Sequence, residues 1–197
     1  MCRPLRWLCL IVLLALPACS DEGRIAPQDP TVDPNEEIQR GWELFRARDF
    51  HSAADLFRRV IENRPNAAAG YIGLGWCEIE VDSIANACET LERAVALSND
   101  VDGFAGLAAA ASALGRDSTA VEASLHVSEE SYIFIGDPSF SYTDVVFIRA
   151  LGLFHLLRYE ECLEALQILD PYLEIDLGAL DFRELLFNKL QSLRGDV

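Results

Sequence analysis

Apolar residues recur at the spacing of three to four residues that is typical of a helix along the chain after about residue 35. No stretch alternates apolar and polar residues for long enough to predict a sheet. Short polar turns are expected where one helix ends and the next begins, at residues 47–49, 81–83, 115–117 and 157–158. The hydrophobic pattern therefore predicts an all-α protein built from short helices.

Two columns of small residues repeat within this helical region. The first column contains Gly41, Gly75, Ala108 and Ala150, and the second contains Ala53, Ala87, Ala120 and Cys162. Successive members are separated by 34, 33 and 42 residues in both columns. Small residues at equivalent positions allow two paired helices to approach closely. A period of about 34 residues with two helices per unit indicates a tandem helical repeat.

These positions resemble the tetratricopeptide-repeat (TPR) family. The second repeat matches the family pattern best, with Tyr71, Leu74, Gly75, Ala87, Leu91 and Ala94. Two positions depart from the pattern, because Ser124 and Arg149 stand where the family has apolar residues. The resemblance implies a right-handed superhelix of about four helix-turn-helix repeats within residues 36–197. A helix over Asp181–Leu193, opened by the capping-box pattern Asp181-x-x-Glu184, is expected to cover the last repeat.

The gap of 42 residues places an insertion of about eight residues between Ala120 and Ala150. It falls at about 129–144, in the stretch EESYIFIGDPSFSYTD, which is rich in aromatic residues and contains the turn Gly136-Asp137-Pro138. Two interpretations remain open. Tyr132, Phe134 and Phe140 fill the seam between repeats three and four, or the loop itself binds a partner.

The resemblance also implies that the first helix of each repeat lines a concave groove. The expected groove residues are Ile38, Trp42, Phe45, Ile72, Trp76, Ile79, Phe147, Leu151 and Phe154, with Ala105, Ala109 and Ser112 from the third repeat. Trp42 and Trp76 are the expected anchors for an apolar or extended peptide segment. The competing interpretation is that the C-terminal segment of the chain fills the groove.

The N-terminus has the architecture of an export signal, with two arginines followed by an apolar run that is short for a membrane span. Leu16-Pro17-Ala18-Cys19 resembles the lipobox of bacterial lipoproteins. The resemblance implies a signal peptide over residues 1–18, lipidation of Cys19 and a polar tether over residues 19–35. It also implies a lipid anchor facing the periplasm, with Ser20 after the lipidated cysteine favouring the outer membrane.

The formal net charge of −16 opposes binding to nucleic acid. Cys77 and Cys88 fall on the two helices of one repeat and are interpreted either as small buried residues or as a disulfide. None of the histidines His51, His126 and His155 belongs to a motif with metal-ligand spacing. We therefore predict a protein without catalytic residues, metal or cofactor that binds a protein or peptide of the cell envelope. The alternative is an accessory lipoprotein that binds a small molecule or a glycan.

Overall fold

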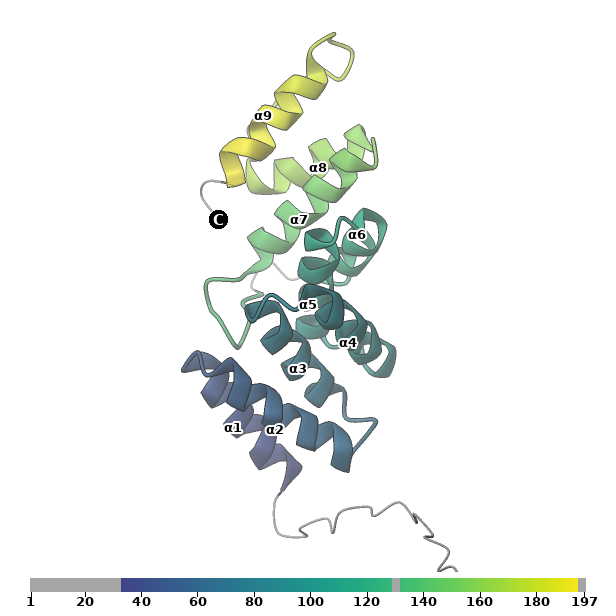
Figure 1. Cartoon of the computed structure of the whole chain (residues 1–197). Coiled ribbons are helices and arrows are strands. Elements are labelled where there is room, and N and C mark those ends of the chain that lie inside the picture. The colour runs from purple at the N-terminus through teal and green to yellow at the C-terminus, as the bar shows by residue number, and fades with distance from the viewer. Residues whose placement is uncertain (1–32, 129–131, 195–197) are drawn as a thin grey trace, which may run out of the picture. The chain divides into compact units, whose positions relative to one another are not determined.

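The computed structural model describes residues 33–128 and 132–194. The predicted signal peptide, Cys19 and most of the predicted tether lie outside the described residues, as do the first three residues of the predicted insertion. The described residues form nine α-helices (Figure 1): α1 (Pro34–Arg46), α2 (Phe50–Asn63), α3 (Ala68–Glu80), α4 (Ile84–Leu97), α5 (Val101–Ala113), α6 (Asp117–Leu125), α7 (Tyr142–His155), α8 (Tyr159–Leu169) and α9 (Phe182–Arg194).

The helices pack in chain order as four antiparallel hairpins: α1–α2, α3–α4, α5–α6 and α7–α8. Each helix from α1 to α7 contacts the next one, and each odd-numbered helix also contacts the following odd-numbered helix. The only β-type pairing in the described residues is an isolated bridge between Ile133 and Ser141. The all-α prediction is confirmed. None of the described helices is both long enough and apolar enough to span a membrane.

The columns of small residues lie where the helices of one hairpin meet. Ala53, Ala87, Ala108 and Ala120 have no exposed surface. A Cβ atom on Gly41 would lie 2.7 Å from Cζ of Phe57, and one on Gly75 would lie 2.5 Å from Cγ of Leu91. Both distances are shorter than van der Waals contact. The small residues are therefore required by close helix packing, as their periodic spacing predicted.

The four hairpins turn in the same way. Each of the four turns contains one residue in the left-handed conformation, with φ between 59° and 68°. In chain order these residues are Arg48, Asp82, Gly115 and Leu157. In each case the next residue donates its backbone N–H to a carbonyl five residues earlier, as from Asp49 to Leu44 at 2.9 Å. The four turns are separated by 34, 33 and 42 residues, the spacing of the small-residue columns. This agreement independently supports the repeat.

The last helix occupies nearly the predicted range, since α9 begins and ends one residue later than expected. Leu186 and Leu190 of α9 are buried and join a core cluster with residues of α7 and α8. α9 contacts α7 in the manner of an odd-numbered helix of a fifth hairpin. It therefore covers the face of the fourth hairpin that the repeat would otherwise leave exposed.

Candidate functional site

The predicted groove residues of the first two repeats gather on neighbouring helices, α1 and α3. Phe45, Ile72 and Trp76 are only 3–4% exposed, and Trp42 is partly buried. Trp42 contacts Phe45 edge-on, with a ring-centroid distance of 5.5 Å. Side chains that line an open groove would be more exposed than this. Their burial arises because another part of the chain covers them.

The covering segment is the predicted insertion. Residues 132–142 form a short hairpin in which Phe134 donates its N–H to Phe140 O at 2.9 Å and Tyr142 donates to Tyr132 O at 3.0 Å. We call residues 132–140 the plug loop. Its extended backbone points alternate side chains in opposite directions. Tyr132 and Phe134 are consequently buried, whereas Ile133 and Ile135 remain 59% and 58% exposed.

Phe134 is the centre of the contact between the plug loop and the groove. Its ring stacks on Trp76 with centroids 3.8 Å apart, and it meets Trp42 and Phe45 edge-on at 5.7 Å and 5.8 Å. Phe140 adds an edge contact to Trp76 at 5.2 Å. We call Trp42, Phe45 and Trp76 the aromatic box. The box encloses Phe134 so completely that its side chain is 1% exposed.

A polar latch accompanies these aromatic contacts. Tyr132 donates its hydroxyl to Oδ1 of Asp102 at 2.9 Å, and Trp76 donates Nε1–H to the backbone oxygen of the same residue at 3.0 Å. Burial raises the pKa of the Asp102 carboxyl, although the bond from Tyr132 acts in the opposite direction. Burial also raises the pKa of Tyr132, so its hydroxyl keeps the proton that it donates.

The position of the plug loop corrects one expectation and refines another. One of the two interpretations of the insertion placed its aromatic residues in the seam between repeats three and four, but they lie on the groove formed by α1, α3 and α5. The competing interpretation was that the C-terminal segment fills the groove. Over the first repeats the chain does fill its own groove, but the segment that does so is the insertion. Whether the groove residues bind a partner is not tested by this arrangement and stays a prediction.

The groove residues of the fourth repeat have a different neighbour. Phe147, Leu151 and Phe154 are partly buried against the core cluster that contains Leu186 and Leu190 of α9. The ring of Phe154 lies 6.1 Å from that of Phe187. The C-terminal segment therefore covers this end of the predicted groove. The C-terminal segment covers the predicted groove residues of the fourth repeat, and the insertion covers those of the first two.

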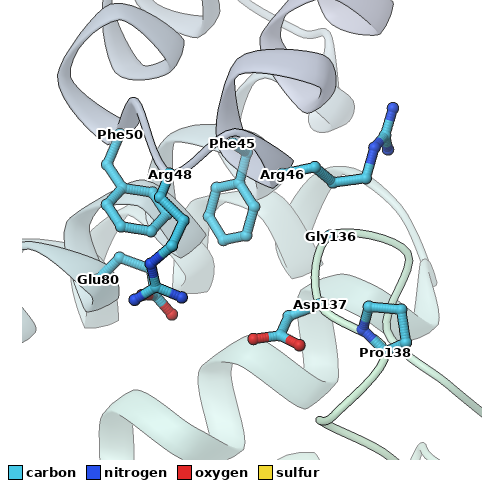
Figure 2. Close-up of a pocket in the computed structure, with 8 residues that line it drawn as sticks. All are labelled: Phe45, Arg46, Arg48, Phe50, Glu80, Gly136, Asp137 and Pro138. Carbon is cyan, nitrogen blue, oxygen red and sulfur yellow. The ribbon is translucent and has the colours of Figure 1, made fainter.

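Two cavities flank the plug loop, each with the loop as one wall and the helices as the other. The larger, of about 510 Å³, lies between the loop and Trp76, Ile79 and Ala109, and it has a rim of hydroxyl and carboxylate groups. The smaller, of about 260 Å³, is lined by Phe45, Arg46, Arg48, Phe50, Glu80 and loop residues 136–138 (Figure 2). Packing between loop and groove is therefore close at the aromatic box and more open around residues 136–140.

The lining of the smaller cavity includes two arginines, Arg46 and Arg48, and two carboxylates, Glu80 and Asp137. Arg48 lies over the ring of Phe50 at 5.3 Å and 3.7 Å from the carboxylate of Glu80. Figure 2 shows Arg48 beside Glu80, Asp137 on the loop side of the cavity, and Arg46 extending away. Hydrogen bonds from the backbone and hydroxyl of Ser139 lower the pKa of Asp137, and attraction to Arg48 lowers it further. Asp137 is therefore ionised at neutral pH.

Arg149 holds the base of the insertion, a role that the sequence analysis missed. It donates from Nη2 to the backbone oxygens of Ser124 at 2.6 Å and Val127 at 3.3 Å, and from Nε to Oγ of Ser124 at 3.2 Å. These carbonyls lie at the end of α6, where helical partners run out. The two residues that depart from the repeat pattern are thus partners of each other. Two polar residues at normally apolar positions were the signal that could have revealed them.

The cysteines do not form the disulfide that was considered. Cys77, Cys88 and Cys162 are buried free thiols. Cys88 faces the following repeat, where Arg116 donates to its sulfur at 3.3 Å, whereas Arg58 of the preceding repeat is the basic group near Cys77. The two sulfurs therefore have different neighbours. Burial raises the pKa of Cys77 and of Cys162 to about 12, which suppresses the reactive thiolate.

The histidines lie apart from one another. His126 stacks on Phe104 with centroids 4.0 Å apart, and Nδ1 of His155 lies 3.0 Å from the carboxylate of Asp117. In the part of the chain that the structure describes, no group of three or more potential ligands is arranged to hold a metal ion. The features that could support a function are therefore the aromatic box, the plug loop and the two cavities.

No protein-family model and no curated protein matches the sequence. Solved structures do match. YrrB, described as a TPR protein with an unusual peptide-binding site, is 16% identical, with a TM-score of 0.62 over 83% of this chain and 88% of YrrB. The chain has the TPR fold. A part of MamA from Desulfovibrio magneticus RS-1 is 18% identical, with a TM-score of 0.52 over 83% of this chain and 77% of that one.

A TPR protein from Parabacteroides merdae matches at 15% identity, with a TM-score of 0.54 over 83% of this chain and 60% of that chain. At such identities the likeness concerns the fold alone. The helices that form the groove in this chain belong to the shared fold.

Proposed function

We propose that the protein is a non-enzymatic scaffold of the bacterial cell envelope that binds an extended segment of a partner protein in its concave groove. The observation that carries this proposal is the aromatic box with Phe134 inside it. The groove already holds an extended segment of chain through one aromatic side chain. Aromatic side chains in a desolvated pocket are the usual energetic centres of protein interfaces.

The fold supports the same class of function. A groove lined by several parallel helices offers alternating pockets to a segment in extended conformation. YrrB, which has the same fold, is described as having a peptide-binding site. A partner would bind this groove after displacing the plug loop, or would enter the larger cavity beside it.

Photo-crosslinking tests the location of partner binding. A photoreactive residue at Ala109 would line the larger cavity, and a matched control at Arg93 would lie on the exposed side of α4. We expect a defined partner to cross-link from position 109 and not from position 93. Trp76→Ala should weaken this cross-link while the far-ultraviolet circular dichroism remains helical. Equal cross-linking from both positions would count against a groove site.

The envelope location is part of the proposal and is supported by the sequence of residues 1–19. Cys19 would carry the lipid after cleavage of the signal, and two or more acyl chains suffice for stable anchoring. The polar tether after it would hold the TPR region away from the bilayer surface. The net charge of −16 would further reduce contact with anionic lipid head groups.

Fractionation tests the anchor. The native protein should sediment with membranes, resist extraction by carbonate and incorporate labelled palmitate, whereas Cys19→Ser should lose all three properties. Density-gradient separation should then place the native protein in the outer membrane. Palmitate labelling of the Cys19→Ser protein at the native level would remove the lipoprotein from the proposal.

A second candidate function is favoured by the larger cavity. Trp76 and Phe140 present aromatic surface there, beside hydroxyl groups of Ser139 and Thr143. Aromatic faces and convergent polar groups are suited to a glycan or another small polar ligand. A thermal-shift screen against envelope glycans would favour this function if a hit were abolished by Phe140→Ala and unaffected by a distant control, Arg93→Ala.

A further inference from the structure

The plug loop occupies the groove in the manner of a bound peptide. Its backbone is extended, its inward side chains Tyr132 and Phe134 enter the groove, and its outward side chains Ile133 and Ile135 face solvent. The plug loop is also an insertion relative to the repeat. The helices of a standard repeat array pack without such a segment. The aromatic box and the plug loop are therefore separable features of the chain.

Contacts between the plug loop and the helices are concentrated at a few points. Among the described residues, a single hydrogen bond, from Tyr132 to Asp102, joins the loop to α1, α3 or α5. Cavities of about 510 Å³ and 260 Å³ lie between the helices and loop residues 136–140, although Phe140 still contacts Trp76 there. A segment held at an aromatic anchor and flanked by open space can leave without disturbing the helical hairpins.

The smaller cavity places a positive charge near the loop. Asp137 follows Phe134 by three residues and lines this cavity together with Arg48 of the turn between α1 and α2, whose ion-pair partner is Glu80 (Figure 2). The attraction of Arg48 for the Asp137 carboxylate acts across the cavity, beyond ion-pair distance. Between the two anchors, Gly136 passes so close to the box that an added Cβ would lie 2.5 Å from Phe134 Cζ and 2.9 Å from Phe45 Cε1. The loop thus presents an aromatic residue, two residues of spacing and a carboxylate.

We propose that the plug loop is an internal stand-in for the partner, and that the groove recognises an extended segment with an aromatic residue followed three residues later by a carboxylate. The aromatic side chain takes the place of Phe134 in the box, and the carboxylate takes the place of Asp137 before Arg48. The proposal rests on the proposed scaffold function and names the chemistry of its partner. The loop and the partner then compete, and the closed loop lowers the observed affinity for the partner.

A peptide with the sequence of residues 131–142, SYIFIGDPSFSY, tests this inference directly. The peptide contains no tryptophan, and removal of the signal peptide with Trp7 leaves Trp42 and Trp76 as the two tryptophans of the protein. Intrinsic fluorescence therefore reports binding at the aromatic box. The host is the Cys19→Ser protein made without residues 1–18, compared with the same protein carrying Phe134→Ala, which empties the box.

We expect the peptide to bind the Phe134→Ala protein at least about tenfold more tightly than the protein with an intact loop, because only the latter must first open. A peptide with alanine in place of its phenylalanine at position 134 should lose binding. A peptide with lysine in place of its aspartate should bind weakly, and Arg48→Glu in the protein should restore its binding. Binding restored by this exchange would show that the peptide carboxylate interacts with Arg48 itself and not with the net charge of the protein.

Binding of the alanine peptide as tightly as the native peptide would overturn the inference, as would failure of the charge exchange. A second host, in which residues 132–140 are replaced by a glycine-serine segment of equal length, covers the case in which the altered loop stays closed. If neither host binds the native peptide while both remain helical, the inference is wrong. Light scattering must also show that the protein is a monomer. If two copies exchange their plug loops to form a dimer, the groove binds a second copy of this chain and the inference is wrong.

The outcome for the proposed function remains distinguishable. A partner that cross-links from Ala109 in the presence of saturating loop peptide would overturn the stand-in role and leave the groove function intact. A partner whose cross-link is removed by the loop peptide, and not by the alanine peptide, would support both.

Discussion

The replacement Phe134→Ala separates a plug in a groove from an ordinary core residue. The Phe134 ring is 1% exposed and contacts all three residues of the aromatic box. Truncation of a buried phenylalanine in a sealed core costs about 3–5 kcal/mol, of which about 1.5–3 kcal/mol is the loss of apolar transfer. Here the space left by the ring adjoins the larger cavity, so water can enter it and little of the cavity cost applies. We expect a loss of about 2–3 kcal/mol in the free energy of unfolding.

The spectroscopic consequence is sharper than the stability loss. Trp76 is 3% exposed because Phe134 stacks on it, so its emission should shift to longer wavelength when Phe134 is removed. The helical circular dichroism should stay unchanged, since α1 to α9 keep their own contacts. Urea denaturation followed by both signals measures the free energy and the two spectral changes in one experiment.

Phe57→Ala is the matched control. Phe57 has no exposed surface, and its ring lies where Cβ atoms on Gly41 and Gly73 would come within 2.7 Å and 2.3 Å of it. This site is sealed between α1, α2 and α3, so its truncation should cost the full amount of about 3–5 kcal/mol and reduce helicity. Equal losses of helicity in the two variants would refute the description of the loop as a plug. Unchanged tryptophan emission in Phe134→Ala would refute it also.

Four further predictions concern individual contacts. Arg149→Met removes the side-chain donor to the backbone oxygens of Ser124 and Val127, of which Ser124 keeps the bond from the N–H of Val127, and it should cost about 1–3 kcal/mol. A double-mutant cycle with Ser124→Ala should show coupling of at least about 0.5 kcal/mol, and additive losses would contradict the pairing. Leu157→Gly should stabilise the protein by about 0.5–1 kcal/mol in thermal or urea unfolding, because Leu157 is exposed and held at φ 62°. Burial raises the pKa of Asp102, so the folded protein binds the proton of this carboxyl more tightly than the unfolded chain does, and proton binding stabilises the fold increasingly as pH falls through the folded pKa. Asp102→Asn keeps an acceptor for Tyr132 and should flatten this part of a plot of stability against pH. An unaltered plot would contradict the assignment. The three buried thiols should resist a thiol reagent at pH 8 in the folded Cys19→Ser protein and react fully after unfolding, whereas rapid reaction of the folded protein would contradict their burial.

The repeat was predictable from the sequence because its physical cause leaves a periodic record. Close packing of two helices requires a small residue at each crossing, so Gly41 and Gly75 recur at the same offset from Ala53 and Ala87. The turns follow the same spacing, even though only Gly115 among the four left-handed residues is a glycine. Hairpin packing therefore determines the backbone at Arg48, Asp82 and Leu157 against their local preference.

The position of the insertion was not predictable in the same way. A segment outside the repeat has no equivalent in the other hairpins, so periodicity cannot assign the surface on which Phe134 lies. Its alternation of Tyr132 and Phe134 with two isoleucines contains the needed signal, because an extended segment with aromatic residues on one side requires an apolar surface. The aromatic residues expected in the groove supply that surface. The pairing of the insertion with the groove can be inferred only when both sets of aromatic residues are considered together.

Hydrogen exchange of individual backbone amides tests the central claim, that the plug loop is a removable occupant of a preformed groove. The amides of Phe134 and Tyr142, which bond within the loop hairpin, are compared with those of Leu74 and Trp76 in α3. We predict that the amides of Phe134 and Tyr142, whose hydrogen bonds close the hairpin of residues 132–142, exchange through a local opening whose free energy does not change at low denaturant. The α3 amides should exchange only through an opening that denaturant promotes. Equal protection of all four amides, with the same dependence on denaturant, would show that the loop and helices open as one unit and would contradict the account.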